Sequence, residues 1–117
     1  MGAILMHFPP TSHCAALIGL DGQGRTRVRI SGQIDADTVP ELEHSLTVVT
    51  ADRGIVLDLS GVDFMDCSGV NLLLRLRERA PAVVLVAPRP MVRRILDVTG
   101  ARVMFEFAAP GPAAQAS

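Results

Sequence analysis

Three consecutive residues near the middle of the chain carry side chains that could do chemistry. Asp66 supplies a carboxylate, Cys67 a thiol and Ser68 a hydroxyl, and Gly69 follows them. An apolar run over residues 55–59 precedes this stretch and a leucine-rich run with helical spacing follows it, so the expected order is strand, acidic turn, helix. These side chains should therefore lie at a helix N-terminus, where backbone N–H groups lack partners and the helix dipole is positive.

A catalytic role for this turn lacks the residues that it would need. A nucleophilic Cys67 requires a base or an arginine cradle, but no histidine lies in a nearby predicted loop and no arginine follows at the spacing of a phosphate-binding cysteine loop. Ser68 is not part of a Gly-x-Ser-x-Gly motif, and the glycine-rich nucleotide-binding motifs are absent from the sequence. Asp63 and Asp66 could suggest a metal, but two carboxylates in a turn are more often helix caps. We therefore expect no catalytic residue, no metal and no cofactor, and predict that the protein is not an enzyme.

The composition excludes several other classes of function. The 117 residues carry a net charge of -1, which gives no general attraction to nucleic acid or to an anionic membrane. Cys14 and Cys67 are too far apart to form a Cys-x-x-Cys pair, so neither a zinc site nor a disulfide scaffold is indicated. The apolar runs are much shorter than the roughly 18 residues that span a bilayer. We expect a soluble cytoplasmic protein that neither binds nucleic acid nor inserts into a membrane.

Hydrophobic periodicity predicts a single α/β domain in which strands and helices alternate. Apolar or alternating runs predict strands at 15–20, 25–30, 55–59, 83–87 and 103–107. Helical spacing predicts helices that begin near Thr38, Val70 and Pro90. The order β-β-α-β-α-β-α-β indicates a mixed, mostly parallel sheet with the helices packed chiefly on one face.

The two ends of the chain are expected to lie outside this domain. Residues 1–13 contain two prolines and show no period, so we predict a flexible N-terminal arm. Residues 108–117 are rich in proline, alanine and glycine and should form a disordered tail. The domain itself is predicted to span residues 14–107.

Three polar residues have expected structural roles. Thr38 and Glu41 have the spacing of a capping box, which predicts a helix start at Thr38. Asp58 interrupts an apolar strand, so its carboxylate should be hydrogen-bonded or lie near the strand end. Asp66 is expected to cap the helix that follows it, and this role is compatible with any function.

Three stretches of the sequence together resemble the signature of STAS domains, the fold of the bacterial anti-sigma factor antagonists. The first is Asp58-Leu-Ser-Gly-Val-Asp-Phe-Met-Asp-Cys-Ser-Gly-Val, which stands before the leucine-rich helix. The second, Ile30-Ser-Gly-Gln-Ile-Asp-Ala-Asp-Thr, is similar to the family's Gly-x-Leu-Asp-x-x-Thr loop. The third, Pro90-Met-Val-Arg-Arg-Ile-Leu-Asp-Val-Thr-Gly, is similar to its third-helix motif. The match runs in order from about residue 15 to 107, so it is specific.

The resemblance implies a binding protein that frees a sigma factor. Members of the family bind a GHKL-type serine kinase, the anti-sigma factor, that holds a sigma factor inactive. The resemblance assigns the docking of this partner to the surface around Asp35, Asp66, Cys67, Ser68 and Gly69. Whether the domain forms a homodimer is left open by the sequence.

The position of the regulatory phosphate departs from the family pattern. The kinase usually phosphorylates the serine directly after the Asp of Asp-Ser-Ser-Gly, and in this sequence that position is Cys67. Two alternatives follow: either Ser68 accepts the phosphate, or the protein is not switched in this way and acts as a constitutive antagonist or scaffold. The resemblance implies that the loop of Asp35 lies next to this turn. A phosphate beside Asp66 and Asp35 would then weaken docking through like-charge repulsion.

The resemblance also leaves a second function open. The chain could be a STAS subunit of a lipid-trafficking ABC transport system, in which the same turn packs against an ATPase and needs no phosphate. The replacement of the usual acceptor serine by Cys67 favours this alternative. The three motifs are more similar to the antagonist branch.

Overall fold

The computed structural model describes residues 4–8, 14–47 and 53–108 of the chain. These residues form a six-stranded sheet in which each strand lies beside the next one along the chain. The strands are β1 (Ile4–Phe8), β2 (Cys14–Leu20), β3 (Thr26–Ile34), β4 (Ile55–Met65), β5 (Val83–Val86) and β6 (Glu106–Ala108). The helices are α1 (Val39–Leu46), α2 (Cys67–Arg79) and α3 (Pro90–Val98), with a 3₁₀ helix, η1 (Ala101–Met104).

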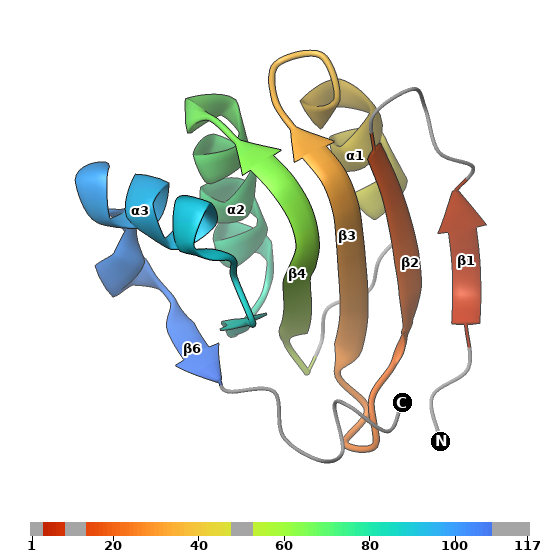
Figure 1. Ribbon diagram of the computed structural model, residues 1–117. Coiled ribbons are helices and arrows are strands. Elements are labelled where there is room, and N and C mark those ends of the chain that lie inside the picture. The colour runs from red at the N-terminus through yellow and green to blue at the C-terminus, as the bar shows by residue number, and fades with distance from the viewer. Residues whose placement is uncertain (1–3, 9–13, 48–52, 109–117) are drawn as a thin grey trace.

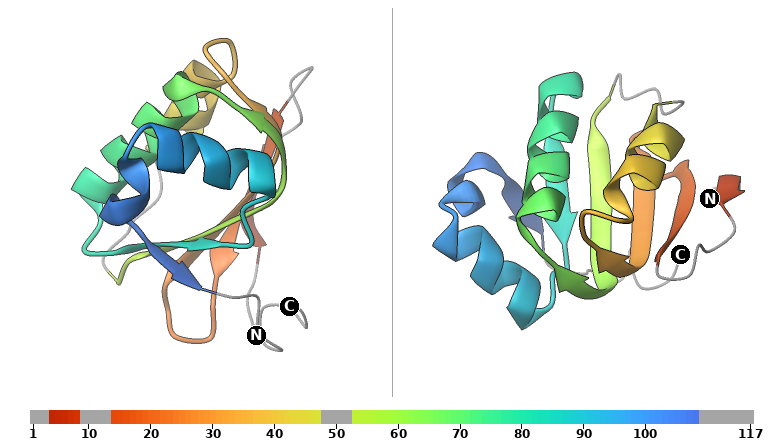
Figure 2. Two further views of the ribbon diagram at one scale, coloured as in Figure 1. Left: turned by 60° about the vertical axis from the view of Figure 1, so that its left-hand side comes forward. Right: turned by 90° about the horizontal axis from the view of Figure 1, so that it is seen from above.

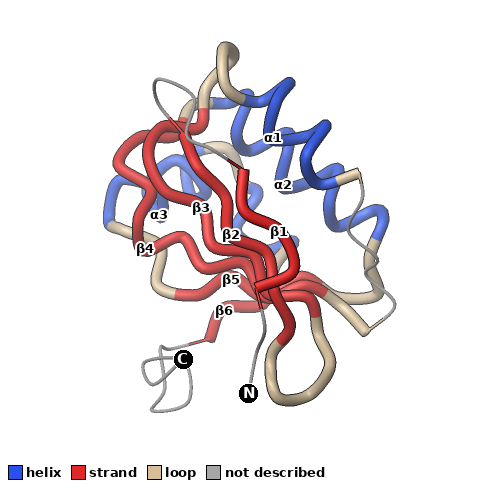
Figure 3. The backbone as a smooth tube through the Cα atoms, turned by 90° about the vertical axis from the view of Figure 1, so that its right-hand side faces the viewer, coloured by secondary structure: helices blue, strands red, loops and turns tan. Residues whose placement is uncertain are grey.

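The sheet is mixed, as the sequence predicts. β1 pairs with β2 and β2 with β3 in antiparallel fashion, whereas β3, β4, β5 and β6 pair in parallel. Parallel neighbours need a crossover, and α1, α2 and α3 supply the three that are required. Helices α1 and α2 lie next to each other behind the sheet in Figure 1 and beside it in Figure 3. Helix α3 and η1 lie at the β5–β6 end of the molecule, away from α1 (Figure 2).

An aliphatic core joins the sheet to the helices. The inward positions of β4 are Ile55, Leu57 and Leu59, which alternate along the strand as the pleat requires. Helix α2 buries Val70, Leu72, Leu73 and Leu76 against the same core, and their spacing of three to four residues gives the helix one apolar face. Within the described part of the chain, no helix combines the length and the apolar character needed to cross a bilayer.

The first strand lies inside the segment that we predicted to be a flexible arm. Residues 4–8 form β1, which pairs with β2 and so belongs to the sheet. The prediction of an arm is therefore wrong for these five residues, because a short apolar run becomes a strand only through pairing with a distant segment, which periodicity does not reveal. Residues 1–3 and 9–13 of that segment lie outside the described residues.

The last strand is shorter and begins later than predicted. Helix α3 ends before Gly100, whose φ of 75° turns the chain into η1, so residues 101–104 are helical and not extended. Strand β6 begins only at Glu106 and includes Ala108, the first residue of the predicted tail. Residues 109–117 lie outside the described residues.

The polar residues in the strands behave largely as the alternation predicts. Asp58 is only 8% exposed, and its carboxylate accepts a hydrogen bond from the backbone N–H of Ser60 at 2.9 Å. It also lies 3.4 Å from a guanidinium nitrogen of Arg27. The expectation that this buried carboxylate is hydrogen-bonded is confirmed. Arg25 pairs with Asp21 at 2.7 Å near the β2–β3 turn, whereas Arg29 is exposed on the sheet.

Candidate functional site

The candidate site lies where β3 and β4 end side by side, and we call the segment Asp63–Gly69 the corner. The two strands are parallel and in register at their last residues, where Ile34 pairs with Met65. The backbone N–H of Asp66 then donates to the carbonyl of Ile34 at 3.2 Å, so the pairing continues one residue beyond β4. Because both strands point the same way, the residues that follow them, Asp35 and Asp66, come to the same edge of the sheet. The structure thus places the Asp35 loop beside the corner, as the resemblance implies.

Strands β3 and β4 reach this edge by running further than the apolar pattern predicts. The pairing between them shifts register twice, between Arg29 and Ser31 and between Gly32 and Gln33. At the first shift the backbones approach closely, because a Cβ on Gly61 would lie 2.8 Å from the Cβ of Ser31. These irregularities interrupt the alternation of buried and exposed residues. The sequence pattern therefore predicted loops where the structure continues both strands.

Asp66 caps helix α2, as predicted. Its backbone is extended, with φ of -114° and ψ of -169°, which is the usual conformation of an N-cap residue. One carboxylate oxygen accepts from the backbone N–H of Ser68 at 2.9 Å and, more weakly, from that of Gly69 at 3.4 Å. Two of the N–H groups that the helix start leaves unpaired are therefore satisfied inside the protein.

Gly69 is buried against the ends of both strands. A Cβ at this position would lie 2.5 Å from Cγ of Met65 and 3.0 Å from Cγ2 of Ile34. The backbone carbonyl of Ile34 would be only 3.2 Å away. Glycine is therefore required here for the first turn of α2 to pack on β3 and β4, which fixes the direction in which the corner faces.

Asp35, and not Thr38, organises the start of helix α1. The Asp35 carboxylate accepts from the backbone N–H groups of Asp37 at 3.0 Å and Thr38 at 3.1 Å. The hydroxyl of Thr38 is turned away and donates to the carbonyl of Gln33 at 2.9 Å. The capping box expected from Thr38 and Glu41 is wrong in this respect, because Thr38 has a helical backbone and makes no side-chain cap. The predicted helix start is nevertheless correct.

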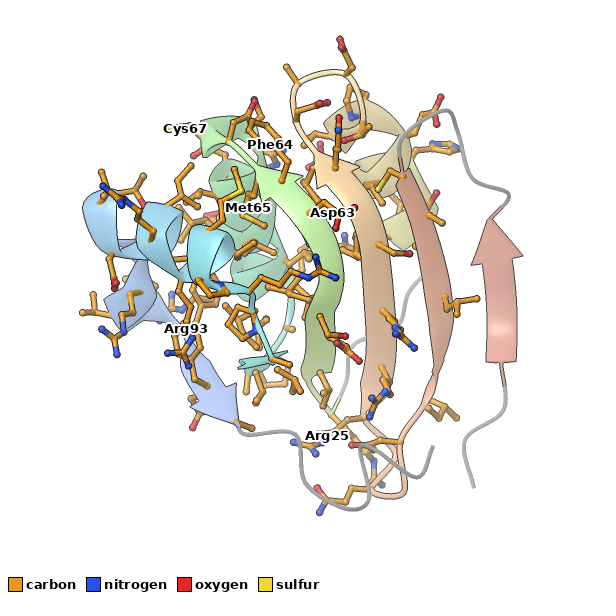
Figure 4. The ribbon with its side chains drawn as sticks, viewed as in Figure 1. Arg25, Asp63, Phe64, Met65, Cys67 and Arg93 are labelled. Atoms are coloured by element: carbon orange, nitrogen blue, oxygen red, sulfur yellow. The ribbon has the colours of Figure 1, made fainter. Side chains whose placement is uncertain are left out.

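Cys67 and Ser68 differ in their exposure to solvent. Cys67 is exposed at the first position of α2, while Ser68 is half-buried. Figure 4 shows Cys67 and Phe64 at the same end of the molecule, above the end of β4. Of these two neighbours, Cys67 is therefore the more accessible to solvent.

Phe64 and Arg89 also lie at this end of the sheet, but the sequence patterns did not identify them as site residues. Phe64 is a residue of the corner and is 37% exposed, although phenylalanine is commonly buried. Arg89 donates from Nε to the carbonyl of Ser60 at 2.8 Å and from a terminal nitrogen to the carboxylate of Asp63 at 2.9 Å. It therefore fixes the start of α3 to the end of β4. Two adjacent exposed residues, Asp63 and Phe64, follow from the register shifts, which left no signal in the alternation.

The corner presents groups that suit binding. Among the described residues, no group of three or more His, Cys, Asp or Glu side chains is placed to hold a metal ion. The Asp35 and Asp66 carboxylates are occupied as backbone acceptors, which suits them to shaping the surface. What remains outward is a thiol, an aromatic ring and the Asp63–Arg89 ion pair, which suits contact with another protein.

Comparison with known proteins agrees with this geometry. The family model of the STAS domain matches residues 20–110, which include every strand and helix from β3 to β6. The chain belongs to the STAS domain family. This membership confirms the fold that the three sequence motifs imply.

Individual relatives of this STAS domain have names that point to one branch of the family. An anti-sigma-B factor antagonist of Listeria monocytogenes is 32% identical over 84 residues, which cover 67% of this chain and 74% of that protein. The protein of the same name from Staphylococcus aureus is 32% identical over 79 residues, covering 62% of this chain and 73% of its own length.

Similar solved structures are also of anti-sigma factor antagonists. The crystal structure of an anti-sigma factor antagonist from Mycobacterium paratuberculosis superposes with a TM-score of 0.74 at 30% identity, covering 90% of this chain and 92% of that one. The anti-sigma factor antagonist SpoIIAA in its unphosphorylated form superposes with a TM-score of 0.65 at 26% identity, covering 80% of this chain and 88% of its own.

Proposed function

We propose that this STAS domain is an anti-sigma factor antagonist that docks its partner on the corner and thereby releases a sigma factor. It acts by binding and not by catalysis. The names of its relatives support the antagonist branch over the transport alternative. The observation that carries the proposal is the exposed start of α2, held in place by the Asp66 cap and by Gly69.

The structure suggests how the corner would recognise a partner. Cys67 and Phe64 present uncharged, partly apolar surface, while Asp63 and Arg89 form an exposed ion pair beside them. An apolar centre with a polar rim is the usual arrangement of a protein interface. Asp35, Asp66 and Gly69 act beneath this surface by fixing its shape.

The first experiment measures binding of the purified anti-sigma factor to the wild-type chain and to its Cys67→Glu variant. A carboxylate at the first position of a helix is stabilised by the positive end of the helix dipole, so this variant should fold normally. It would bring a negative charge into the docking surface, and we expect binding to weaken by about tenfold or more.

The matched control for this experiment is Gln23→Glu, because Gln23 is exposed in the β2–β3 turn. This turn is at the opposite end of the sheet from the corner (Figure 1). The control adds the same charge and should bind like the wild type. Equal binding of the wild type and Cys67→Glu would rule out docking at the corner. A separate pull-down from cell lysate discriminates between the two functions: capture of an ABC ATPase in place of a GHKL-type kinase would support the transport alternative.

The second part of the proposal concerns regulation: the chain is a constitutive antagonist that its partner kinase does not phosphorylate. A serine kinase cannot transfer phosphate to Cys67 in the normal way, and the Ser68 side chain is half-buried below it. Ser68 also lies one position further into the helix, so its hydroxyl would not occupy the place of the usual acceptor.

The test compares the wild type with Cys67→Ser, which restores Asp-Ser-Ser-Gly. Both chains are incubated with the kinase and ATP, and the phosphate is mapped by mass spectrometry. We expect modification at position 67 in the variant and an unmodified wild type. Phosphate on Ser68 of the wild type would show that the switch is retained one residue further along.

A further inference from the structure

A groove lies directly beside the corner, between helix α2 and the segment that follows α3. Its volume is about 340 Å³. One wall consists of residues on a single face of α2, at spacings of three, four and seven, and the other of residues at the end of α3 and in η1. The lining residues are Cys67, Val70, Asn71 and Leu74 on α2, and Thr99, Gly100, Ala101 and Met104 opposite.

The groove has the chemistry of a site for an uncharged side chain. None of its lining residues is charged. The hydroxyl of Thr99 already donates to the carbonyl of Ile95 at 2.7 Å. The exposed amide of Asn71 makes no hydrogen bond to any residue that the structure describes, so it is available to a bound chain. A charge buried in this groove would find no oppositely charged partner among the lining residues.

Exposed apolar side chains gather around the same segment. Val98 is 77% exposed, Met91 43% and Met104 40%, and all three belong to α3 or η1. Single exposed apolar residues are ordinary, but a group of them beside an apolar groove is typical of an interaction surface. The helical turn at Gly100, which replaced the strand expected here, is what brings Met104 to the groove.

The groove and the corner share a residue. Cys67 is the first residue of α2 and also lines the groove, so the two surfaces are continuous. From Cys67 to Leu74 the α2 wall extends about 10 Å along the helix axis, at about 1.5 Å per residue. A protein that covers the corner would therefore reach the groove without any rearrangement of this chain.

We propose that the groove is the second part of the docking surface and receives an uncharged aliphatic or aromatic side chain of the same anti-sigma factor. This inference rests on the proposed function. The volume, near the lower end of the range for ligand pockets, suits one or two side chains. An anchor of this kind, seated in an apolar pocket next to polar contacts, is where binding energy concentrates in protein interfaces. The Asn71 amide is placed to bond the backbone that carries the anchor.

The test uses two charged substitutions in the groove and one beside it. Met104→Glu and Asn71→Glu each place a carboxylate in the groove, and we expect each to weaken binding of the purified anti-sigma factor by about tenfold or more. Val103→Glu adds the same charge at the neighbouring residue, which is more exposed and does not line the groove. It should bind within about twofold of the wild type.

The outcomes separate this inference from the proposed function. If both groove variants bind like the wild type while Cys67→Glu does not, docking at the corner stands and the groove is not part of it. An equal loss in Val103→Glu would show a general charge effect and would also overturn the inference. Failure of the wild type to bind would remove the proposed function and this inference with it.

Two further measurements guard against misfolding and against self-association. In the wild type, the methyl resonance of Met104 should shift when the anti-sigma factor is added to saturation, and an unchanged resonance would overturn the inference. Sedimentation of the free chain tests whether a second copy of this chain occupies the groove instead. A dimer that Met104→Glu converts to a monomer would assign the groove to a second copy of this chain.

Discussion

At the scale of single residues, Asp66 combines a structural role with a place in the proposed docking surface. Its carboxylate accepts from the backbone at the start of α2. We therefore predict that Asp66→Ala lowers the free energy of unfolding by about 1 kcal/mol, whereas Asp66→Asn, which retains a capping oxygen, lowers it by much less. Urea unfolding measures both values. Equal stability of Asp66→Ala and the wild type would contradict the capping role.

Gly69 is the residue at which the corner tolerates least change. A Cβ there would approach Met65 and Ile34 more closely than packed atoms allow, so the first turn of α2 must move or the strand ends must shift. We predict that Gly69→Ala lowers the free energy of unfolding by about 1–3 kcal/mol and weakens partner binding. Gly22→Ala serves as the control, because nothing lies within 4 Å of a Cβ at that turn position. Similar stability of the two variants would contradict the packing argument.

These residues differ in how far the sequence alone could identify their roles. The cap at Asp66 was predictable, because it depends on local sequence before a helix. The requirement for glycine at position 69 was not, because it arises from Met65 and Ile34, and Ile34 belongs to a different strand. Asp35 was assigned to the surface through the family resemblance, but its capping of α1 depends on a turn conformation that Thr38 was expected to supply.

At the scale of secondary structure, local patterns located most elements but not their full extent. The cores of β3, β4, β5 and the three helices were predictable from periodicity. The extensions of β3 and β4 were not, because two register shifts break the alternation. Strand β1 and the helical turn η1 depend on pairing and on the backbone of Gly100, neither of which is a local hydrophobic signal. The groove depends on η1, so it could not be foreseen either.

Helices α1 and α2 are joined at their surface by one ion pair. Arg75 donates to both carboxylate oxygens of Glu43, with the longer contact at 3.3 Å. Both side chains are about 40% exposed, so solvent screens the pair. We predict that Glu43→Gln lowers the free energy of unfolding by less than about 1 kcal/mol.

The loss in Glu43→Gln should become smaller in about 1 M salt, where the Debye length is only about 3 Å. Glu78→Gln is a suitable comparison, because Glu78 is exposed on α2 and makes no ion pair within the described residues. A larger, salt-independent loss in Glu43→Gln would show that the pair determines how the two helices pack.

At the scale of the whole molecule, the composition simplifies how the free energy of unfolding should change at alkaline pH. The change should depend mainly on one buried thiol. All eleven basic side chains are arginine, and the chain has no tyrosine. Arginine stays protonated up to a pH of about 12, and histidine and carboxyl groups are already deprotonated at a pH of about 9. With no lysine and no tyrosine in the chain, cysteine is the residue type whose ordinary pKa lies nearest this alkaline range, and the chain has two. Cys67 is exposed, whereas Cys14 lies in the core at 7% exposure.

Burial raises the pKa of the Cys14 thiol from 9.0 to about 11, and the negative charges of Asp35 and Glu41 act in the same direction. Below pH 9 the thiol is protonated in the folded and the unfolded chain, so pH has no effect through this group. Between pH 9 and 11 the unfolded chain ionises and the folded chain does not, so stability must fall as pH rises. A tenfold change in an ionisation constant corresponds to about 1.4 kcal/mol, so the full loss is roughly 3 kcal/mol, of which roughly 2 kcal/mol falls between pH 9 and 11.

Urea unfolding of Cys67→Ser across this pH range, under reducing conditions, measures the loss with Cys14 as the one remaining thiol. The double variant Cys14→Ala and Cys67→Ser should be less stable at neutral pH, because it leaves space in the core. Its stability should, however, stay nearly constant from pH 9 to 11. An equal decline in both variants would mean that alkaline unfolding begins elsewhere in the molecule. A decline confined to the chain that retains Cys14 would show that folding raises the pKa of this thiol and that its burial sets the alkaline limit of stability.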